Sequence, residues 1–133
     1  MEIRTSQSAY QVLKKYVTND VEEFWVMALN STKQMIKIQM IFRGTVDFCF
    51  IHPRDVFRFA ILQNASSILL AHNHPSGEVL PSKQDIIITQ DLILIGKLLQ
   101  IPIVDHIILC KSGYKSLFDE NLVQFNGLKS LSN

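Results

Sequence analysis

Long uninterrupted hydrophobic runs are absent from this sequence of 133 residues. The N-terminal stretch MEIRTSQSAYQVLKKYV has no apolar core of the kind that a signal peptide needs. The most apolar region, roughly residues 86 to 110, is interrupted by Asp91, Lys97 and Asp105 among others. It is therefore not expected to cross a membrane, and we expect a cytoplasmic protein.

Cysteine is scarce, since the sequence has only Cys49 and Cys110. They do not form a C-x-x-C pair, which excludes a Cys-rich zinc finger and a disulfide framework. We expect both to be small core residues in a reduced compartment.

An excess of basic charge is also missing, because 13 Lys and Arg face 12 Asp and Glu and give a net charge of +1. This balance argues against a dedicated nucleic-acid binder, although a local basic patch is compatible with it. The hydrophobic fraction of 47% and the length are those of one folded domain with a real core.

Hydrophobic periodicity predicts strands mixed with helices. The predicted helices cover residues 5–20, 53–64 and 81–100, and the predicted strands cover 22–30, 34–44, 45–51, 66–73 and 101–110. The turn NSTK predicts a hairpin between the first two strands. The run 66–73 is apolar on both faces, as in a central strand. We expect an α/β or α+β layer structure, followed by a short element and a polar tail over 121–133.

The most informative stretch is AHNHPSGEVLPSKQD, residues 71–85. His72 and His74 stand at the carboxyl end of the predicted buried strand, where residues i and i+2 point to the same side. Asp85 falls in the first turn of the next predicted helix, eleven residues after His74. Two imidazoles and a carboxylate can hold Zn²⁺ at about 2.0 to 2.2 Å and leave a fourth position for water.

A structural interpretation competes for part of this stretch. The spacing Ser82-x-x-Asp85 matches a capping box, which stabilises a helix start without any metal. Burying two imidazoles is costly without partners, however, and a cap gives no reason for the histidine pair. The pair together with Asp85 favours metal, and Ser82 can serve both purposes.

A hydrolytic zinc site also needs a base, and a carboxylate is suitable. Glu22 and Glu23 precede a predicted strand and are the candidates. The alternative is that both are solvated residues at a helix–strand boundary, the commoner fate of glutamate. Periodicity does not decide between these interpretations.

The segment HPRDVFRFAILQNASSILLAHNHPSGEVLPSKQD, followed by DHIIL, closely resembles the RadC family, whose domain belongs to the JAB/MPN metalloprotease-like group. The JAMM motif of that group is an upstream Glu, then His-x-His, seven residues, Ser, two residues and Asp. His72, His74, Ser82 and Asp85 match its spacing. The resemblance covers roughly residues 5–124 and implies a single domain over 1–133, with 125–133 as a tail. It also implies a cytidine-deaminase-like fold, a mixed central sheet flanked by helices.

The resemblance implies a zinc site of His72, His74 and Asp85, with water in the fourth position. Ser82 would support the oxyanion, and the upstream glutamate, placed at Glu22 with Glu23 as the fallback, would be the general acid/base. The implied reaction is hydrolysis of an amide or isopeptide bond in a peptide or protein substrate. Zn²⁺ is the expected cofactor, no membrane partner is expected, and a homodimer is an open alternative.

Two departures from the family pattern bear on function. FWVMALN follows the glutamates instead of the Gly-containing segment of deubiquitinating members, so we expect a different peptide-binding surface. The helix-hairpin-helix region that precedes this domain in longer RadC proteins is not expected here. With it goes the best candidate for a DNA-binding element.

Other metal-dependent and nuclease functions fit these residues less well. The letters HNH do not make a homing-type nuclease, whose motif is dispersed over a hairpin and a helix. Zinc deaminases need C-x-x-C and zincins need H-E-x-x-H, and neither motif is in the sequence. Two hypotheses compete with the hydrolase: a DNA repair or mobile-element accessory protein with a structural or vestigial metal site, and a pseudo-enzyme that binds a protein partner.

Three further polar residues complete the list of candidates. We expect His52 to have a structural hydrogen-bonding role. His106 could be a hydrogen-bonding partner of a ligand imidazole. Asn73, between the two candidate ligands, could shape the loop or orient a substrate.

Overall fold

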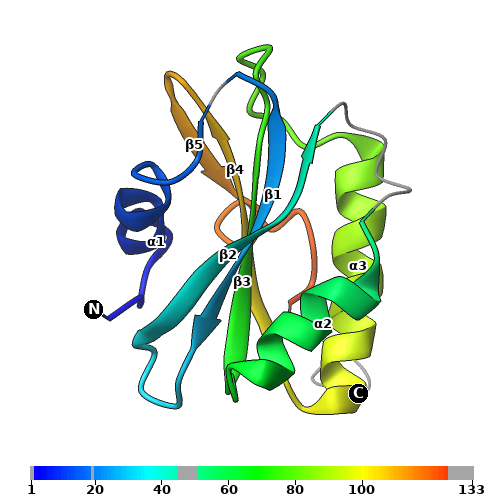
Figure 1. Cartoon of the computed structure of the whole chain (residues 1–133). Coiled ribbons are helices and arrows are strands. Elements are labelled where there is room, and N and C mark those ends of the chain that lie inside the picture. Colours follow the sequence, from blue (N-terminus) through cyan, green and yellow to red (C-terminus); the bar gives the residue numbers. More distant parts are fainter. Residues whose placement is uncertain (1, 19, 45–50, 126–133) are drawn as a thin grey trace.

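The computed structural model describes residues 2–18, 20–44 and 51–125, shown in colour in Figure 1. The elements in these ranges are α1 (Ser6–Leu13), β1 (Glu22–Leu29), β2 (Met35–Gly44), α2 (Pro53–Leu62), β3 (Ser67–Asn73), α3 (Lys83–Leu99), β4 (Ile103–Cys110) and β5 (Gly113–Ser116). None of the helices in these ranges combines the length and the hydrophobicity that crossing a bilayer requires.

The strands form one mixed sheet in the order β2-β1-β3-β4-β5. β1 is antiparallel to β2 and to β3, β3 is parallel to β4, and β4 is antiparallel to β5. The single parallel pair is joined through α3, as parallel strands require a crossover connection. Every residue of the central strand β3 is buried, which agrees with its apolar sequence.

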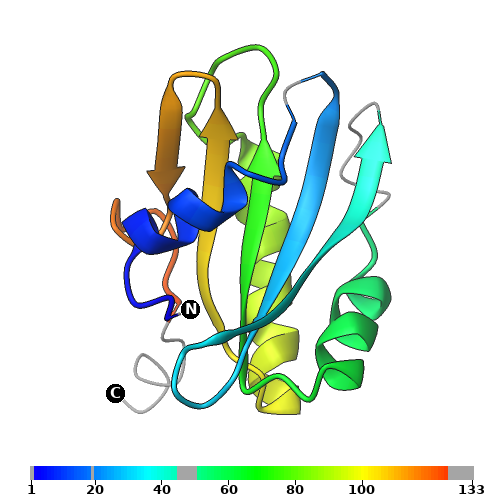
Figure 2. The same ribbon diagram turned by 60° about the vertical axis from the view of Figure 1, so that its left-hand side comes forward.

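Helices cover the two faces of this sheet. Figures 1 and 2 show α1 on one side and α2 with α3 on the other, and we call these sides the α1 face and the α3 face. The predicted fold class, a mixed sheet flanked by helices, is confirmed. Alternation along β1 divides its side chains between the two faces. Phe24 and Val26 pack on the α3 face, and Met27 and Leu29 pack on the α1 face.

Local signals in the sequence set the ends of the long helices. Pro53 occupies the first turn of α2, where its missing N–H costs nothing. Ser82 caps the start of α3, and Gln100 ends that helix in the left-handed conformation with φ 60°. The first helix is shorter than predicted, because the chain tightens after Leu13 into turns with hydrogen bonds from Lys15 to Val12 and from Tyr16 to Leu13.

Some sequence predictions concern residues outside the described ranges, and one strand of the structure was not predicted. The predicted strand 45–51 and the predicted tail lie largely outside the described residues. Conversely, β5 was not predicted, since its sequence GYKS is polar and short. Cys110 is buried, as expected, whereas Cys49 lies outside the described residues.

Candidate metal centre

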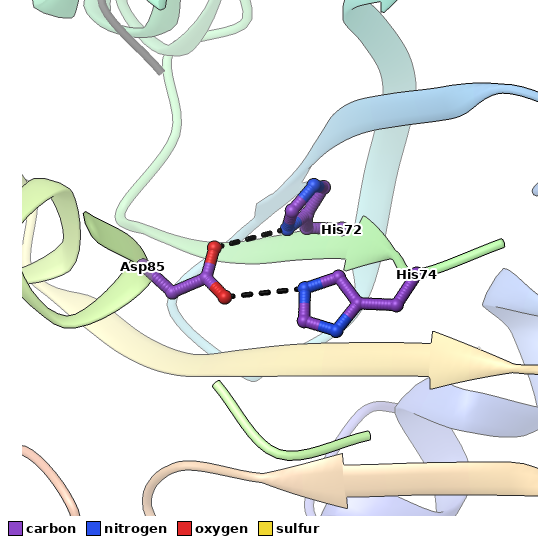
Figure 3. A group of neighbouring side chains, drawn as sticks. All are labelled: His72, His74 and Asp85. Carbon is purple, nitrogen blue, oxygen red and sulfur yellow. Dashed lines mark hydrogen bonds and ion pairs between the residues drawn. The ribbon is translucent and has the colours of Figure 1, made fainter. Parts of the chain in front are cut away.

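Three candidate ligands converge at the carboxyl end of β3 (Figure 3). One ligand atom from each of His72, His74 and Asp85 lies within 4.8 Å of the others. The side chains of His72 and Asp85 are almost fully buried, with 1% and 0% exposed, whereas His74 is 13% exposed. The cluster could hold a metal ion, and His74 is its more accessible member.

The end of β3 explains how the two imidazoles come together. His72 lies within the strand, opposite Phe24 of β1 and Ile108 of β4. His74 follows the last strand residue, and its backbone N–H still bonds to the Leu109 carbonyl at 2.8 Å. The chain then turns at Gly77, whose φ of +92° is a conformation that favours glycine. The extended backbone thus directs residues i and i+2 to one side, as predicted.

Asp85 is placed by the cap of α3. The Asp85 N–H donates to the Ser82 hydroxyl oxygen at 3.0 Å, and the Ser82 N–H donates to Asp85 Oδ2 at 2.7 Å. This reciprocal pair is the predicted capping box. It fixes the Asp85 carboxylate with Oδ1 3.2 Å from His72 Nδ1 and Oδ2 3.2 Å from His74 Nε2. The cap and the candidate ligand are therefore the same carboxylate.

The tautomer of His74 follows from its other neighbour. Its Nδ1 contacts the backbone carbonyl oxygen of Glu78. Because a carbonyl oxygen only accepts hydrogen bonds, we assign the hydrogen of the neutral ring to Nδ1. Nε2, which faces Asp85, is then left with its lone pair. A histidine whose outer N–H donates to a backbone carbonyl is the usual arrangement for a metal ligand.

The electrostatics of the cluster call for a positive charge between these groups. Burial lowers the pKa of His74, but its hydrogen bonds with Asp85 and the Glu78 carbonyl outweigh burial and raise this pKa above its ordinary value. Burial opposes ionisation of Asp85, yet hydrogen bonds with His72 and His74 hold its pKa well below the usual range. A proton shared by these side chains can supply this positive charge, and a divalent cation would compete with that proton for the same atoms.

The two candidate bases separate between the faces of the sheet. Glu22, at the start of β1, is on the α3 face, and its Oε2 lies 2.9 Å from His72 Nε2. Its side chain is 29% exposed, so it lies between the cluster and solvent. Glu23 faces the opposite side and is 3% exposed. Of the two candidates, the structure brings Glu22 to the cluster.

Glu23 is occupied by a set of local donors. Its carboxylate accepts from the Thr18 N–H at 3.1 Å, the Thr18 hydroxyl at 2.9 Å, Trp25 Nε1 at 3.0 Å and Arg43 Nε at 3.2 Å. Burial acts to raise the pKa of Glu23, but the bonds from Trp25, Thr18 and Arg43 outweigh it and lower this pKa. Glu23 is a structural carboxylate that joins the α1–β1 connection to β2.

Asn73 has a place that sequence reasoning did not foresee. It is buried and faces the α1 side, where its Oδ1 accepts from the Glu23 N–H at 2.6 Å. Its Nδ2 donates to the carbonyls of Thr18 and Val21 at 2.6 and 2.9 Å. Of the two roles considered for Asn73, orienting a substrate does not fit, because the amide is buried and its oxygen and nitrogen already bond to the backbone. Asn73 instead ties the end of β3 to the segment that carries Glu22.

The two remaining histidines differ from each other in burial. His52 stands before α2 with an exposed side chain that makes no capping hydrogen bond. His106 is fully buried, and its Nδ1 lies 2.6 Å from the Thr89 hydroxyl. Its ring centroid is 6.4 Å from that of His72, so it lies near the cluster without being one of the three convergent ligands. Thr89 was not singled out from the sequence, although it stands one turn after Asp85 in α3.

Comparisons with known proteins identify the family of the chain. Residues 3–122 match the family model described as RadC-like JAB domain. A UPF0758 protein of Methanosarcina acetivorans is 41% identical over 103 residues, 77% of this chain and 45% of the relative. UPF0758 proteins of Protochlamydia amoebophila and Staphylococcus aureus are 39% identical over 122 residues (91% of this chain, 53% of the relative) and 43% identical over 105 residues (75% and 48%). The chain thus spans about half the length of these relatives, and it belongs to the RadC-like JAB domain family.

Proposed function

We propose that the chain is a zinc-dependent hydrolase that cleaves an amide or isopeptide bond in a peptide or protein. One observation carries the proposal: two imidazoles and a carboxylate converge at a strand end, with a partly exposed glutamate beside them. Two histidines and one carboxylate, with a fourth position left open, are a usual ligand set for catalytic zinc. Zinc held there would supply a nucleophilic water at neutral pH and polarise the substrate carbonyl.

The position of Glu22 supports a role as the general acid/base. Its carboxylate is within hydrogen-bonding distance of His72 and retains contact with solvent. We assign it the removal of a proton from the attacking water and the delivery of that proton to the leaving nitrogen. Such a positioned carboxylate contributes about 10² to 10⁴ in rate.

Ser82 can stabilise charge on the substrate oxygen. Its hydroxyl accepts the Asp85 N–H, which leaves the hydroxyl hydrogen able to donate elsewhere. The residue is exposed at the start of α3, next to the ligand Asp85. We assign to Ser82 a hydrogen bond to the carbonyl oxygen that gains negative charge during attack.

The first experiment is elemental analysis of chain purified without added zinc, beside the His72→Ala and Asp85→Ala variants. Near-stoichiometric zinc that both variants lose would support the site. Full zinc occupancy in the variant that carries both substitutions would exclude the site.

Peptide and isopeptide substrates can then be screened with Glu22→Gln and Glu23→Gln as a matched pair. We expect Glu22→Gln to keep its zinc and lose about 10² to 10⁴ in rate. Glu23→Gln should retain activity in the folded fraction. Equal loss in both variants, or unchanged activity in Glu22→Gln, contradicts the assigned base. Absence of cleavage by the zinc-loaded wild-type chain would instead favour a pseudo-enzyme that binds a partner.

A DNA-associated accessory role is the second candidate. Lys14, Lys15 and Lys111 line a surface pocket of about 390 Å³ beside α1, a local basic feature on a chain of near-zero net charge. Binding of DNA fragments that weakens steeply with salt, and that is lost when the three lysines become glutamine, would support this role. Absence of binding at low salt removes it.

A further inference from the structure

His106 lies in β4 on the same face of the sheet as the candidate metal cluster, two residues before the position opposite His72. It stands opposite Leu70 in the parallel β3–β4 register, in which His72 stands opposite Ile108. Its ring makes an edge contact with Phe24, with centroids 5.7 Å apart, and is fully buried. The proposed hydrolysis requires no role of this imidazole.

Hydrogen bonding fixes the tautomer of His106. The Thr89 hydroxyl oxygen lies 2.6 Å from the Asp85 backbone carbonyl and 2.6 Å from His106 Nδ1. A carbonyl only accepts, so the single hydroxyl hydrogen of Thr89 goes to Asp85. His106 Nδ1 must therefore carry a hydrogen and donate it to Thr89. The result is a directed chain from His106 through Thr89 to the backbone of Asp85.

In this arrangement the other ring nitrogen of His106 has no hydrogen bond that would offset its burial. Within the described residues, the buried Nε2 of His106 has no hydrogen-bond partner. Burial lowers the pKa of His106 to about 3, so the ring is neutral at physiological pH. A buried polar atom without a partner is destabilising, and a leucine would fill this position without one. Packing alone does not explain the imidazole, whereas its contact with Thr89 does.

We propose that His106 is a positioning residue that acts through Thr89 to hold Asp85 in place and so tightens metal binding at the cluster. The proposal rests on the proposed function, since it needs the cluster to hold a metal. Residues that orient the ligands of a metal in this way commonly change its affinity by about 10- to 100-fold. The geometry gives His106 the same influence without contact with the ion.

The tautomer is tested on the wild-type chain by ¹⁵N NMR of the histidine side chains. We expect His106 to carry its hydrogen on Nδ1 and to remain neutral at pH 7. A hydrogen on Nε2 overturns the proposal, because Thr89 could then not donate to Asp85 and accept from His106 at once. This measurement needs no variant and no added metal.

The effect on the metal is tested by zinc competition titrations with paired variants. Thr89→Val and His106→Leu should bind zinc about tenfold or more weakly, whereas Thr89→Ser and His106→Asn, which keep a donor and an acceptor, should lose less. Ile93→Val, which removes a buried methyl group further along α3, is the control and should keep wild-type affinity.

Stability separates positioning from a structural role. Metal-free His106→Leu should unfold at the wild-type urea concentration or above, although its zinc affinity falls. If Thr89→Val and His106→Leu both keep wild-type zinc affinity, the role of His106 is overturned and the proposed function is not affected. A wild-type chain that takes up no zinc overturns both this inference and the proposed function.

Discussion

The two faces of the sheet treat buried polar groups differently. On the α1 face, Glu23, Asn73 and Asp105 each have donors or acceptors that match their own chemistry. On the α3 face, His72 and Asp85 meet through ring nitrogens and carboxylate oxygens that a cation would join, and His106 keeps an unpaired nitrogen. Matched groups stabilise a fold, whereas two imidazoles that converge on one buried carboxylate form a cluster that a bound cation would stabilise.

The largest expected effect is on the α3 face. Asp85→Asn keeps an oxygen for the cap of α3 but removes the charged ligand, so zinc affinity should fall on the order of 100-fold or more. Asp105→Asn, the same change on the α1 face, should leave affinity unchanged. Isothermal titration of both variants makes the measurement. Equal losses would mean that the two faces do not differ as described.

Asn73→Ala should cause the largest loss of folding stability. It leaves the Glu23 N–H and the carbonyls of Thr18 and Val21 without their partner, at a cost of about 3 kcal/mol. Gln90→Ala, at an exposed position of α3, should stay within about 0.5 kcal/mol. Urea unfolding of both variants measures the two losses in the free energy of unfolding. A loss below about 1 kcal/mol for Asn73→Ala would show that Asn73 does not tie β3 to β1.

Asp105 should give the chain a pH-dependent stability. Burial raises the pKa of Asp105 from 3.8 to about 6, although the Ser116 hydroxyl and two backbone N–H groups bond to it. The folded state therefore favours the protonated form, and this stabilisation is present below pH 4 and is lost as pH rises through 6. In Asp105→Asn the decline between pH 4 and 7, about 2 kcal/mol, should disappear.

The exposed Asp91→Asn is the control for that profile. It should keep the wild-type decline when unfolding is followed by urea titration at several pH values. A decline of the same size in Asp105→Asn would assign the pH dependence to another group.

The smallest expected effects concern the adjacent glutamates in metal-free protein. Glu23→Gln disturbs a carboxylate that accepts from Thr18, Trp25 and Arg43, so it should cost about 1 to 2 kcal/mol. Glu22→Gln, at a partly exposed position, should stay within about 0.5 kcal/mol. Thermal unfolding compares the two. A reversed order would place the structural carboxylate at Glu22.

The convergence of the three candidate ligands was predictable because each step is local. The i, i+2 spacing of His72 and His74 and the capping box that orients Asp85 depend only on extended and helical geometry. The long helices and the buried strand β3 followed from periodicity and from proline and cap signals in the same way.

Periodicity could not choose between Glu22 and Glu23, because β1 is apolar on both faces, and only the family resemblance favoured Glu22. Phe24 and Val26 on one side are matched by Trp25 and Met27 on the other, so alternation gives no contrast that identifies the inner face. The partners of Asn73 and His106 depend on strand order and register, which the sequence does not show. Only the antiparallel pairing of β1 with β3 brings Glu22 to His72.

The position of the ligands in one strand–loop–helix unit has a consequence for how the site assembles. His74 and Asp85 are 11 residues apart, whereas Glu22 and His72 are 50 residues apart. Closing the short loop costs little chain entropy, so a small part of the chain is enough to bring the three candidate ligands together. The approach of Glu22 requires the long loop to close and the sheet to register. Local opening at β1 would therefore withdraw Glu22 while His72, His74 and Asp85 stay together, so the proposed hydrolysis should be more sensitive to such opening than zinc affinity.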